Sequence, residues 1–246
     1  MYTLPRLYVK GPLAPGGHIL LDSDPAHYLV HVLRLRAGAG IRIFDGVSGE
    51  YHAVLTDIQK KSVALRVEMQ LRPQGARDAP LHLIFPPLKK EALDILIEKA
   101  TELGVDHFHP VLTARADVRK INPDRLMAQI TESAEQCERL TLPVLHPLQD
   151  LSALLVAWPT STNIYMAIER EVAASPLARA LDQYAPQKTG YAFLIGPAGG
   201  WERSECTYPQ TFPFLRGVEL GPNILRAETA ALAMLAVYQL CHKELP

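Results

Sequence analysis

Three polar residues, Arg226, Glu228 and Thr229, lie between a glycine-proline turn and an apolar segment of the chain. Arginine and glutamate are seldom fully buried unless they are paired. Beside an apolar helix they can contact a ligand, where a guanidinium stabilises negative charge and a carboxylate accepts a proton. A structural alternative is open: Arg226 pairs with Glu228, or Glu228 alone interacts with the amino end of the helix.

Two glycine-rich turns precede these residues: 196–200, after the apolar run 191–195, and 221–223, after the run 217–220. Short apolar runs bounded by turn residues are typical of buried strands. Ligands of α/β sheets bind where strands end in loops, and glycine lets a ligand approach the main chain closely. The turns predict one pocket built mostly from backbone, although the first turn alone could equally be an ordinary tight turn.

Strand and helix patterns alternate around these turns. The expected strands are 81–85, 108–112, 163–168, 191–195 and 217–220, and the expected helices are 89–103, 122–140 and 228–240. Gly104 is placed to end the first of these helices. The alternation favours an α/β domain with a largely parallel sheet.

Residues 1–72 have a different pattern. Short strand-like runs occur at 6–9, 18–21, 40–44, 51–58 and 62–69, and one helix is expected from Asp24-Pro25 to about Arg34. Several short strands separated by turns favour a small barrel. The segment 73–80, which is rich in proline and glycine, is expected to be a linker.

The chain resembles the SPOUT methyltransferases, since GPxGG follows one strand and LGPxxLRxET precedes a helix. More narrowly, it resembles the family that methylates N3 of a uridine in 16S ribosomal RNA. Further matches, in the family's order, are His31-Val32-Leu33-Arg34, Phe44-Asp45-Gly46, Ala100-Thr101-Glu102-Leu103-Gly104-Val105 and Glu135-Gln136-Cys137-Glu138-Arg139. One departure is Ala198, where the family usually has a glutamate.

The resemblance implies an α/β protein with two domains. An N-terminal PUA-like β-barrel that binds RNA would comprise residues 1–72, and a SPOUT domain with a deep trefoil knot would comprise 81–246. The superfamily also implies a homodimer. Burial of the helix 228–240 in a monomer core would explain its apolar character equally well.

The implied cofactor is S-adenosylmethionine, held mainly by main-chain groups. The expected contacts are Ile168, Leu194, Ile195, Gly196, Pro197, Gly199, Gly200, Leu220, Gly221, Pro222, Ile224, Leu225 and Thr229. Some of the aliphatic residues could instead be plain core. Arg226 would stabilise negative charge on the uracil carbonyls, and Glu228 is the candidate proton acceptor.

The implied RNA contacts are mostly basic: Arg6, Arg34, Arg36, Arg115, Arg119, Lys120, Gln136 and Arg139. Any one of them could equally be a solvated surface residue. Residues 1–72 carry nine Lys and Arg against six Asp and Glu, although the whole chain has a net charge of −1. This distribution suits a localised basic patch better than binding over the whole surface.

Composition excludes several classes of protein. The 246 residues are 48% hydrophobic and 21% charged, as in soluble globular proteins. No apolar run has membrane-spanning length, and three unpaired-looking cysteines favour a reducing cytoplasm. His107 and His109 would share a strand face, but no third ligand is evident, so no metal site is expected.

Two rival functions remain. Ala198 favours a non-catalytic RNA-binding protein that retains the fold. The other is a methyltransferase that acts on transfer RNA instead of ribosomal RNA.

Overall fold

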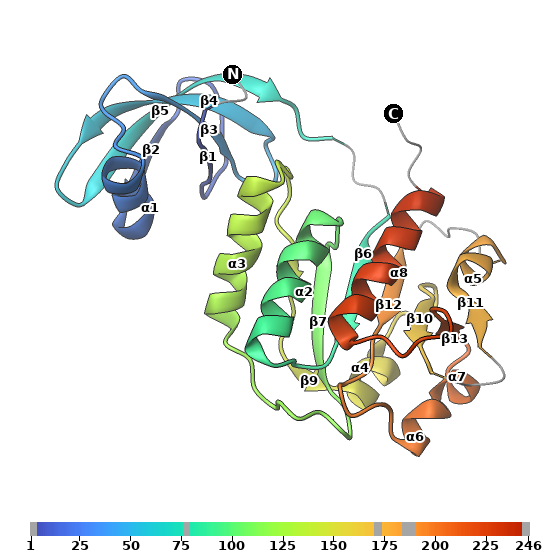
Figure 1. The fold of residues 1–246 in the computed structure, drawn as a ribbon. Coiled ribbons are helices and arrows are strands. Elements are labelled where there is room, and N and C mark those ends of the chain that lie inside the picture. The colour runs from blue at the N-terminus through green and yellow to red at the C-terminus, as the bar shows by residue number, and fades with distance from the viewer. Residues whose placement is uncertain (1–3, 76–78, 170–173, 184–189, 243–246) are drawn as a thin grey trace. The chain divides into compact units, whose positions relative to one another are not determined.

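The computed structural model describes residues 4–75, 79–169, 174–183 and 190–242 (Figure 1). The chain divides into two compact units: Met1–Ala76 with Ala134–Leu142, and Arg77–Ser133 with Pro143–Pro246. The segment Ala134–Leu142 was expected to belong with the second domain. The structure instead groups it with the first unit.

A five-stranded sheet forms the first unit. Its order is β1 (Arg6–Tyr8), β3 (Gly40–Phe44), β4 (Glu50–Ile58), β5 (Ser62–Arg72) and β2 (His18–Asp22). β1 pairs in parallel with β3, and the other neighbours are antiparallel. Val63, Leu65 and Val67 of β5 are buried, as their alternation with polar residues predicts.

The helix expected between Asp24 and Arg34 is shorter and divided. An α-helix, α1 (Ser23–His27), continues into a π-helical turn, η1 (Tyr28–Val32). Asp22 is the N-cap residue instead of Asp24, so Pro25 lies within the first turn. Arg34 lies after the helix with a positive φ of 55°.

Asp45 closes the turn that follows β3. Its buried carboxylate accepts hydrogen bonds from the backbone N–H of Leu13 (3.1 Å), Val47 (2.9 Å) and Ser48 (2.6 Å), and from the Ser48 hydroxyl (2.7 Å). Burial alone would raise the pKa of Asp45, but these hydrogen bonds outweigh it and hold the pKa below its usual value. The carboxylate therefore fixes the turn and also attaches the segment at Leu13.

A buried charge cluster attaches Ala134–Leu142 to the small sheet. The Arg6 guanidinium donates to the Glu50 carboxylate and to the carbonyl oxygens of Ala134 (2.7 Å) and Arg139 (2.6 Å). It also lies 3.8 Å above the centre of the Phe44 ring. Glu50 is only 1% exposed, so its charge requires this compensation.

The second unit contains an eight-stranded sheet whose pairings are all parallel. Its order is β11 (Ser175–Pro176), β13 (Leu215–Glu219), β10 (Ile164–Ala167), β12 (Tyr191–Leu194), β6 (Leu81–Phe85), β7 (His107–Leu112) and β8 (Val144–Leu145), and β9 (Gln149–Asp150) pairs with β7. The parallel sheet predicted from the sequence is thus confirmed. The short strands β8, β9 and β11 were not predicted.

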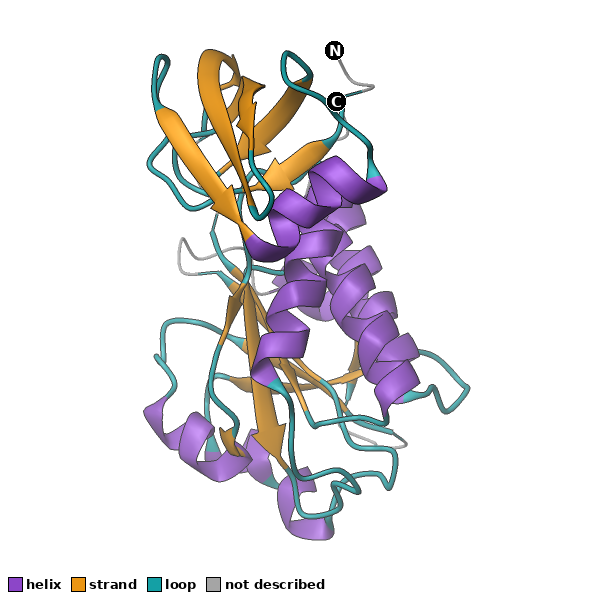
Figure 2. Cartoon of the chain, turned by 90° about the vertical axis from the view of Figure 1, so that its left-hand side faces the viewer, coloured by secondary structure: helices purple, strands orange, loops and turns teal. Residues whose placement is uncertain are grey.

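Helices flank both faces of this sheet (Figure 2). They are α2 (Lys90–Glu102), α3 (Pro123–Gln136), α4 (Leu151–Ala157), α5 (Leu177–Gln183), α6 (Arg203–Cys206), α7 (Tyr208–Thr211) and α8 (Ala227–His242). α2 and α8 pack against each other in one core, and α4 belongs to the core on the opposite face. No helix in these described ranges is long and apolar enough to cross a membrane.

The ends of α2 and α3 can be compared with the ends predicted from the sequence. Gly104 follows the end of α2 with a φ of 88°, as predicted. α3 ends at Gln136 instead of near Leu140, and Glu138 has a positive φ of 59°. Gln136 and Arg139 therefore do not share a helix face, which corrects that expectation.

We predict that Asp45→Asn lowers the free energy of unfolding by about 1–3 kcal/mol at pH 7, because buried N–H groups lose a charged acceptor. The folded-state pKa lies below the unfolded value of about 3.9, so this stability is present above that pH and is lost as pH falls through the folded pKa. Urea unfolding at several pH values measures it.

Asp57→Asn is the matched control, since Asp57 is exposed on β4 and accepts only from the Gln59 side chain. A difference between wild type and Asp45→Asn that stays constant down to strongly acidic pH would contradict the role of the ionised carboxylate.

Candidate functional site

A cavity of about 1060 Å³ opens where four parallel strands of the second unit end. The segments after β6, β10, β12 and β13 contribute to its wall. Pro87–Lys89 follows β6, Ala167–Glu169 ends β10, Gly196–Trp201 follows β12, and Glu219–Glu228 follows β13. This is the carboxyl edge of the sheet, where α/β proteins bind their ligands.

The two glycine-rich turns meet in this cavity, as the sequence predicts. Gly200 and Gly221 have φ values of 71° and 114°, which L side chains rarely adopt. At Gly196 the constraint is packing instead, since an added Cβ would lie 2.9 Å from the Trp201 ring. An added Cβ at Gly199 would lie 3.2 Å from the carbonyl oxygen of Arg115. These glycines therefore present their main chain to the cavity without a side chain.

Aliphatic side chains line another part of the cavity. Ile168, Leu220, Ile224 and Leu225 belong to it, together with both prolines of the turns, Pro197 and Pro222. Trp201 also contributes, and its indole N–H donates to the carbonyl oxygen of Ala167 (2.8 Å). Sequence reasoning missed this tryptophan, although its place directly after two glycines was a usable signal.

Three predicted contact residues lie elsewhere. Leu194 and Ile195 are fully buried in opposite cores of the unit. The backbone N–H of Ile195 donates to the carbonyl oxygen of Ile84 in the sheet (3.1 Å). Thr229 is exposed but is not among the lining residues. The alternative of plain core packing thus applies to the two aliphatic residues.

Arg226 and Glu228 both line the cavity at the start of α8. Arg226 is exposed, and its carbonyl oxygen accepts from the N–H of Ala230 (2.8 Å). Within the described residues, no ion pair joins Arg226 to Glu228 or to another acid. Glu228 lies in the first helical turn, where the helix dipole favours a carboxylate.

The loop after β7 is attached to the glycine-rich turn through α6. Arg115 Nε donates to Glu202 (2.9 Å), and the N–H of Ala114 donates to buried Glu205 (2.9 Å). Glu202 and Glu205 form a capping box at the start of α6. A backbone hydrogen bond from Arg203, and then Arg115, lower the pKa of Glu202. Arg115 is thus positioned by protein groups.

The other predicted RNA contacts divide into exposed and engaged residues. Arg34, Arg36, Arg119, Lys120 and Gln136 are exposed. Arg139 is half-buried, and its Nε donates to the Thr141 hydroxyl (3.0 Å).

Arg6 is a correction to the predicted RNA contacts. It is 8% exposed, and its guanidinium is occupied by Glu50 and three carbonyl oxygens. It therefore has a structural role instead of a phosphate-binding one.

Family models match both parts of the chain. A model described as an RNA methyltransferase domain matches residues 76–239, and one described as an RNA methyltransferase PUA domain matches residues 21–68. An α/β methyltransferase domain after a PUA-like domain is therefore the architecture of this chain.

Relatives along the whole chain carry a consistent name. A protein named ribosomal RNA small subunit methyltransferase E, from Rickettsia conorii, is 31% identical, and the match covers 96% of this chain and 95% of that one. A crystal structure with the same name, from Neisseria gonorrhoeae and bound to S-adenosyl methionine, has a TM-score of 0.83 at 27% identity, over 96% and 97% of the two chains. A putative methyltransferase from Legionella pneumophila, in complex with the same cofactor, has a TM-score of 0.83 at 26% identity over the same shares.

The two glycine-rich turns and the polar residues at the start of α8 form one cavity in a fold that matches these proteins along nearly its whole length. The chain belongs to the family of the ribosomal RNA small subunit methyltransferases E.

Proposed function

We propose that the protein transfers a methyl group from S-adenosylmethionine to N3 of one uridine in the 16S ribosomal RNA of the small subunit. The observation that carries the proposal is the cavity at the carboxyl edge of the large sheet, which is lined by both glycine-rich turns and by Arg226 and Glu228. Methylation of ribosomal RNA with this cofactor is the activity of the family; the position on the base is our extension.

The cavity fits the cofactor. Its volume of about 1060 Å³ is at the upper end of ordinary ligand sites, which leaves space for a base beside the cofactor. Main-chain N–H and carbonyl groups around Gly196, Gly199, Gly200 and Gly221 suit the polar atoms of an adenosine and an amino acid. Ile168 and Leu225 suit its apolar surfaces. When bound, the cofactor supplies an electrophilic methyl group on a sulfonium.

The protein's contribution is positioning and electrostatic stabilisation. Alignment of acceptor and methyl carbon can lower a barrier by about 7 kcal/mol or more. Uracil N3 must lose its proton, and negative charge then spreads over the neighbouring carbonyl oxygens. Arg226 is placed to stabilise that charge, and Glu228 is the candidate acceptor of the proton.

Ala198 does not oppose this assignment. It lines the cavity at a position where the family usually has a glutamate, and its neighbours Gly196, Gly199 and Gly200 have no side chain. A site that binds through main-chain groups does not depend on the side chain at this position. The rival of a non-catalytic RNA-binding protein predicts no methyl transfer, and the rival acting on transfer RNA predicts a different product.

We extend the proposal to fold details and assembly. The first unit would close as a PUA-like barrel, and the second would contain the deep trefoil knot of the SPOUT proteins. A homodimer is supported by α8, on which Ala233, Ala236 and Leu240 lie at helical spacing and at least partly exposed. Ribosomal subunits as substrate would place the protein in the cytoplasm.

The direct test uses labelled cofactor and small subunits from cells that lack the enzyme. Digestion to nucleosides should give labelled 3-methyluridine, with little labelling of short oligonucleotides, because N3 must be presented on an unpaired or flipped base. Label on carbon 5, on ribose or only on transfer RNA would refute the substrate. Absence of both cofactor binding and label would favour the non-catalytic rival.

We predict that Gly200→Val abolishes measurable cofactor binding in calorimetric titration. A β-branched residue resists a φ of 71°, so the turn must change shape where the ligand approaches it. The control is Gly38→Val, which has a φ of 88° and equally open surroundings but lies in the first unit. Equal cofactor affinities for the two variants would show that this turn does not line the pocket.

Arg226→Ala should lower kcat by about 100-fold or more, the size typical of losing one donor that stabilises developing charge. Cofactor affinity should change little, since main-chain groups supply it. Arg203→Ala, at an exposed arginine on α6, should leave kcat unaltered. Full turnover in Arg226→Ala would show that the guanidinium is structural.

Replacing both Arg119 and Lys120 with serine should weaken RNA binding. It should also reduce the slope of log affinity against log salt by roughly 1.5, because two phosphate contacts release their counterions. The matched control is Lys60→Ser with Lys61→Ser, two exposed lysines in the turn after β4. Arg115 is left unchanged because it binds Glu202. A slope that drops equally in both double variants would indicate a general charge effect.

A further inference from the structure

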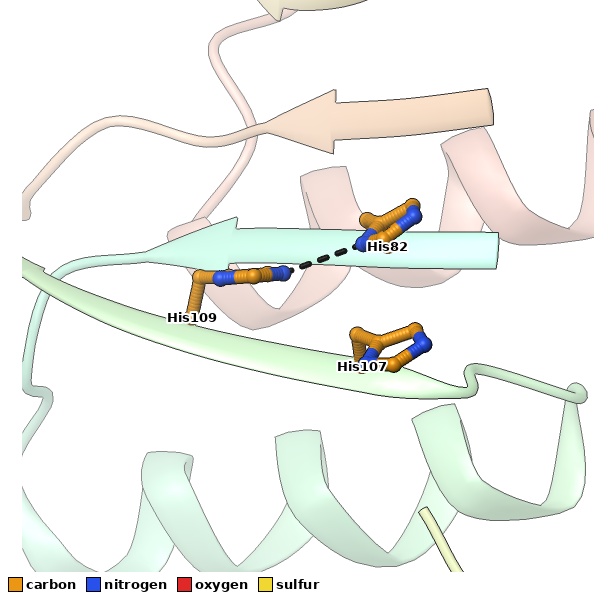
Figure 3. A group of neighbouring side chains, drawn as sticks. All are labelled: His82, His107 and His109. Atoms are coloured by element: carbon orange, nitrogen blue, oxygen red, sulfur yellow. Dashed lines mark hydrogen bonds between the residues drawn. The ribbon is translucent and has the colours of Figure 1, made fainter. Parts of the chain in front are cut away.

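Four histidines gather on one face of the large sheet, at the amino ends of its strands. His82 lies on β6, His107 and His109 on β7, and His146 directly after β8 (Figure 3 shows the first three). The parallel register aligns His82 with His107. Because alternate residues of a strand share a face, His109 follows on the same side, and the N–H of His146 donates to the carbonyl oxygen of Phe108 beside it (2.9 Å).

The imidazoles contact one another through their nitrogens and their faces. Nδ1 of His82 lies 3.0 Å from Nε2 of His109, and Nδ1 of His107 lies 3.1 Å from Nε2 of His146. The rings of His82 and His107 are stacked, as are those of His109 and His146. One ring nitrogen each of His82, His107 and His109 lies within 4.8 Å of the other two.

We propose that His82, His107 and His109 bind a zinc ion. In a tetrahedral zinc site with bonds of 2.0–2.1 Å, nitrogen ligands are about 3.4 Å apart, and the three ring nitrogens lie within 4.8 Å of one another. Because an imidazole binds a metal in the plane of its ring, the stacked rings of His82 and His107 would have to turn out of their stack to share the ion. Three neutral imidazoles suit zinc and neighbouring first-row ions, and no carboxylate or thiolate is needed. His82 and His107 are half-buried, which leaves a water molecule access as the fourth ligand.

The surroundings support this assignment. Nε2 of His109 faces His82 and is the nitrogen that would bind the ion, whereas Nδ1 of the same ring is buried without a partner among the described residues. His146 would hold His107 through its other nitrogen, as outer partners of metal-bound histidines commonly do. Trp158 packs edge-on against His82 and His109 and shields one side.

This site is separate from the methyl-transfer cavity. The histidines lie at the amino ends of β6 and β7, whereas the cavity begins after the carboxyl end of β6 at Pro87. His82 lies three residues before Phe85, the last residue of β6, which at about 3.3 Å each is roughly 10 Å from the end of the strand where the cavity begins. The zinc would join β6 and β7 directly, with His146 after β8 as an outer partner, and so stabilise the sheet instead of reacting.

The test is zinc titration of the full-length protein after removal of any purification tag and of bound metal with a chelator. We expect one tight equivalent of zinc per chain, a higher Tm with zinc, and visible absorption of a tetrahedral site with cobalt. His109→Gln and His107→Gln should each weaken zinc binding by about 100-fold or more, since each removes a ligand.

His31→Gln is the matched control. His27 and His31 also contact each other, on exposed positions of α1 and η1, but they offer only two imidazoles. This variant should keep the tight equivalent. Retained cofactor binding in each variant shows that the second unit is folded. Absence of a tight equivalent in the wild type, or its loss in His31→Gln but not in His109→Gln, would overturn the proposal and leave a stack of neutral imidazoles.

Discussion

The methyl-transfer cavity depends on one pairing arrangement, in which β10 bonds in parallel to β12 on one edge and to β13 on the other. Ile164 is in register with both Ala192 and Leu215, and Met166 with both Leu194 and Gly217. Three strands therefore end at nearly the same level, and their loops must meet. The relative position of these loops is therefore set by backbone hydrogen bonds between the strands.

The structure of the first unit depends on a different interaction, the pairing of the buried Glu50 carboxylate. Such a carboxylate is tolerated only with compensating charge and hydrogen bonds, and Arg6 and Arg42 provide it at 8% and 5% exposure. Together with Ala134–Leu142, the unit carries ten Lys and Arg against eight Asp and Glu. The positive surplus of residues 1–72 thus overstates the charge available to RNA, because part of it neutralises the interior.

Sequence patterns predicted the large elements because each has a local physical cause. Gly104 ends α2 since glycine tolerates its positive φ, and the apolar run before the first glycine-rich turn is a buried strand. The strand before the second turn, β13, is only partly buried, since Glu219 is exposed. What could not be predicted depends on distant partners. Arg6 pairs with Glu50 and with carbonyls more than 120 positions away, and nothing in its sequence neighbourhood indicates this. Leu194 and Ile195 were predicted to line the pocket because apolar residues at the end of a strand and apolar residues of a pocket wall give the same sequence pattern.

The histidine cluster is the clearest case of contacts between distant residues that the sequence could not predict. Its members come from positions 82, 107, 109 and 146, and only the register of β6, β7 and β8 brings them together. A sheet face under a helix normally selects aliphatic residues, because buried polar atoms need partners. The imidazoles meet part of that need through one another, in two nitrogen contacts among four rings, while Nδ1 of His109 has no partner among the described residues. Replacing one ring leaves its neighbour's nitrogen without a partner, and the amino edge of the sheet is therefore as constrained as the carboxyl edge, but by side chains instead of by backbone.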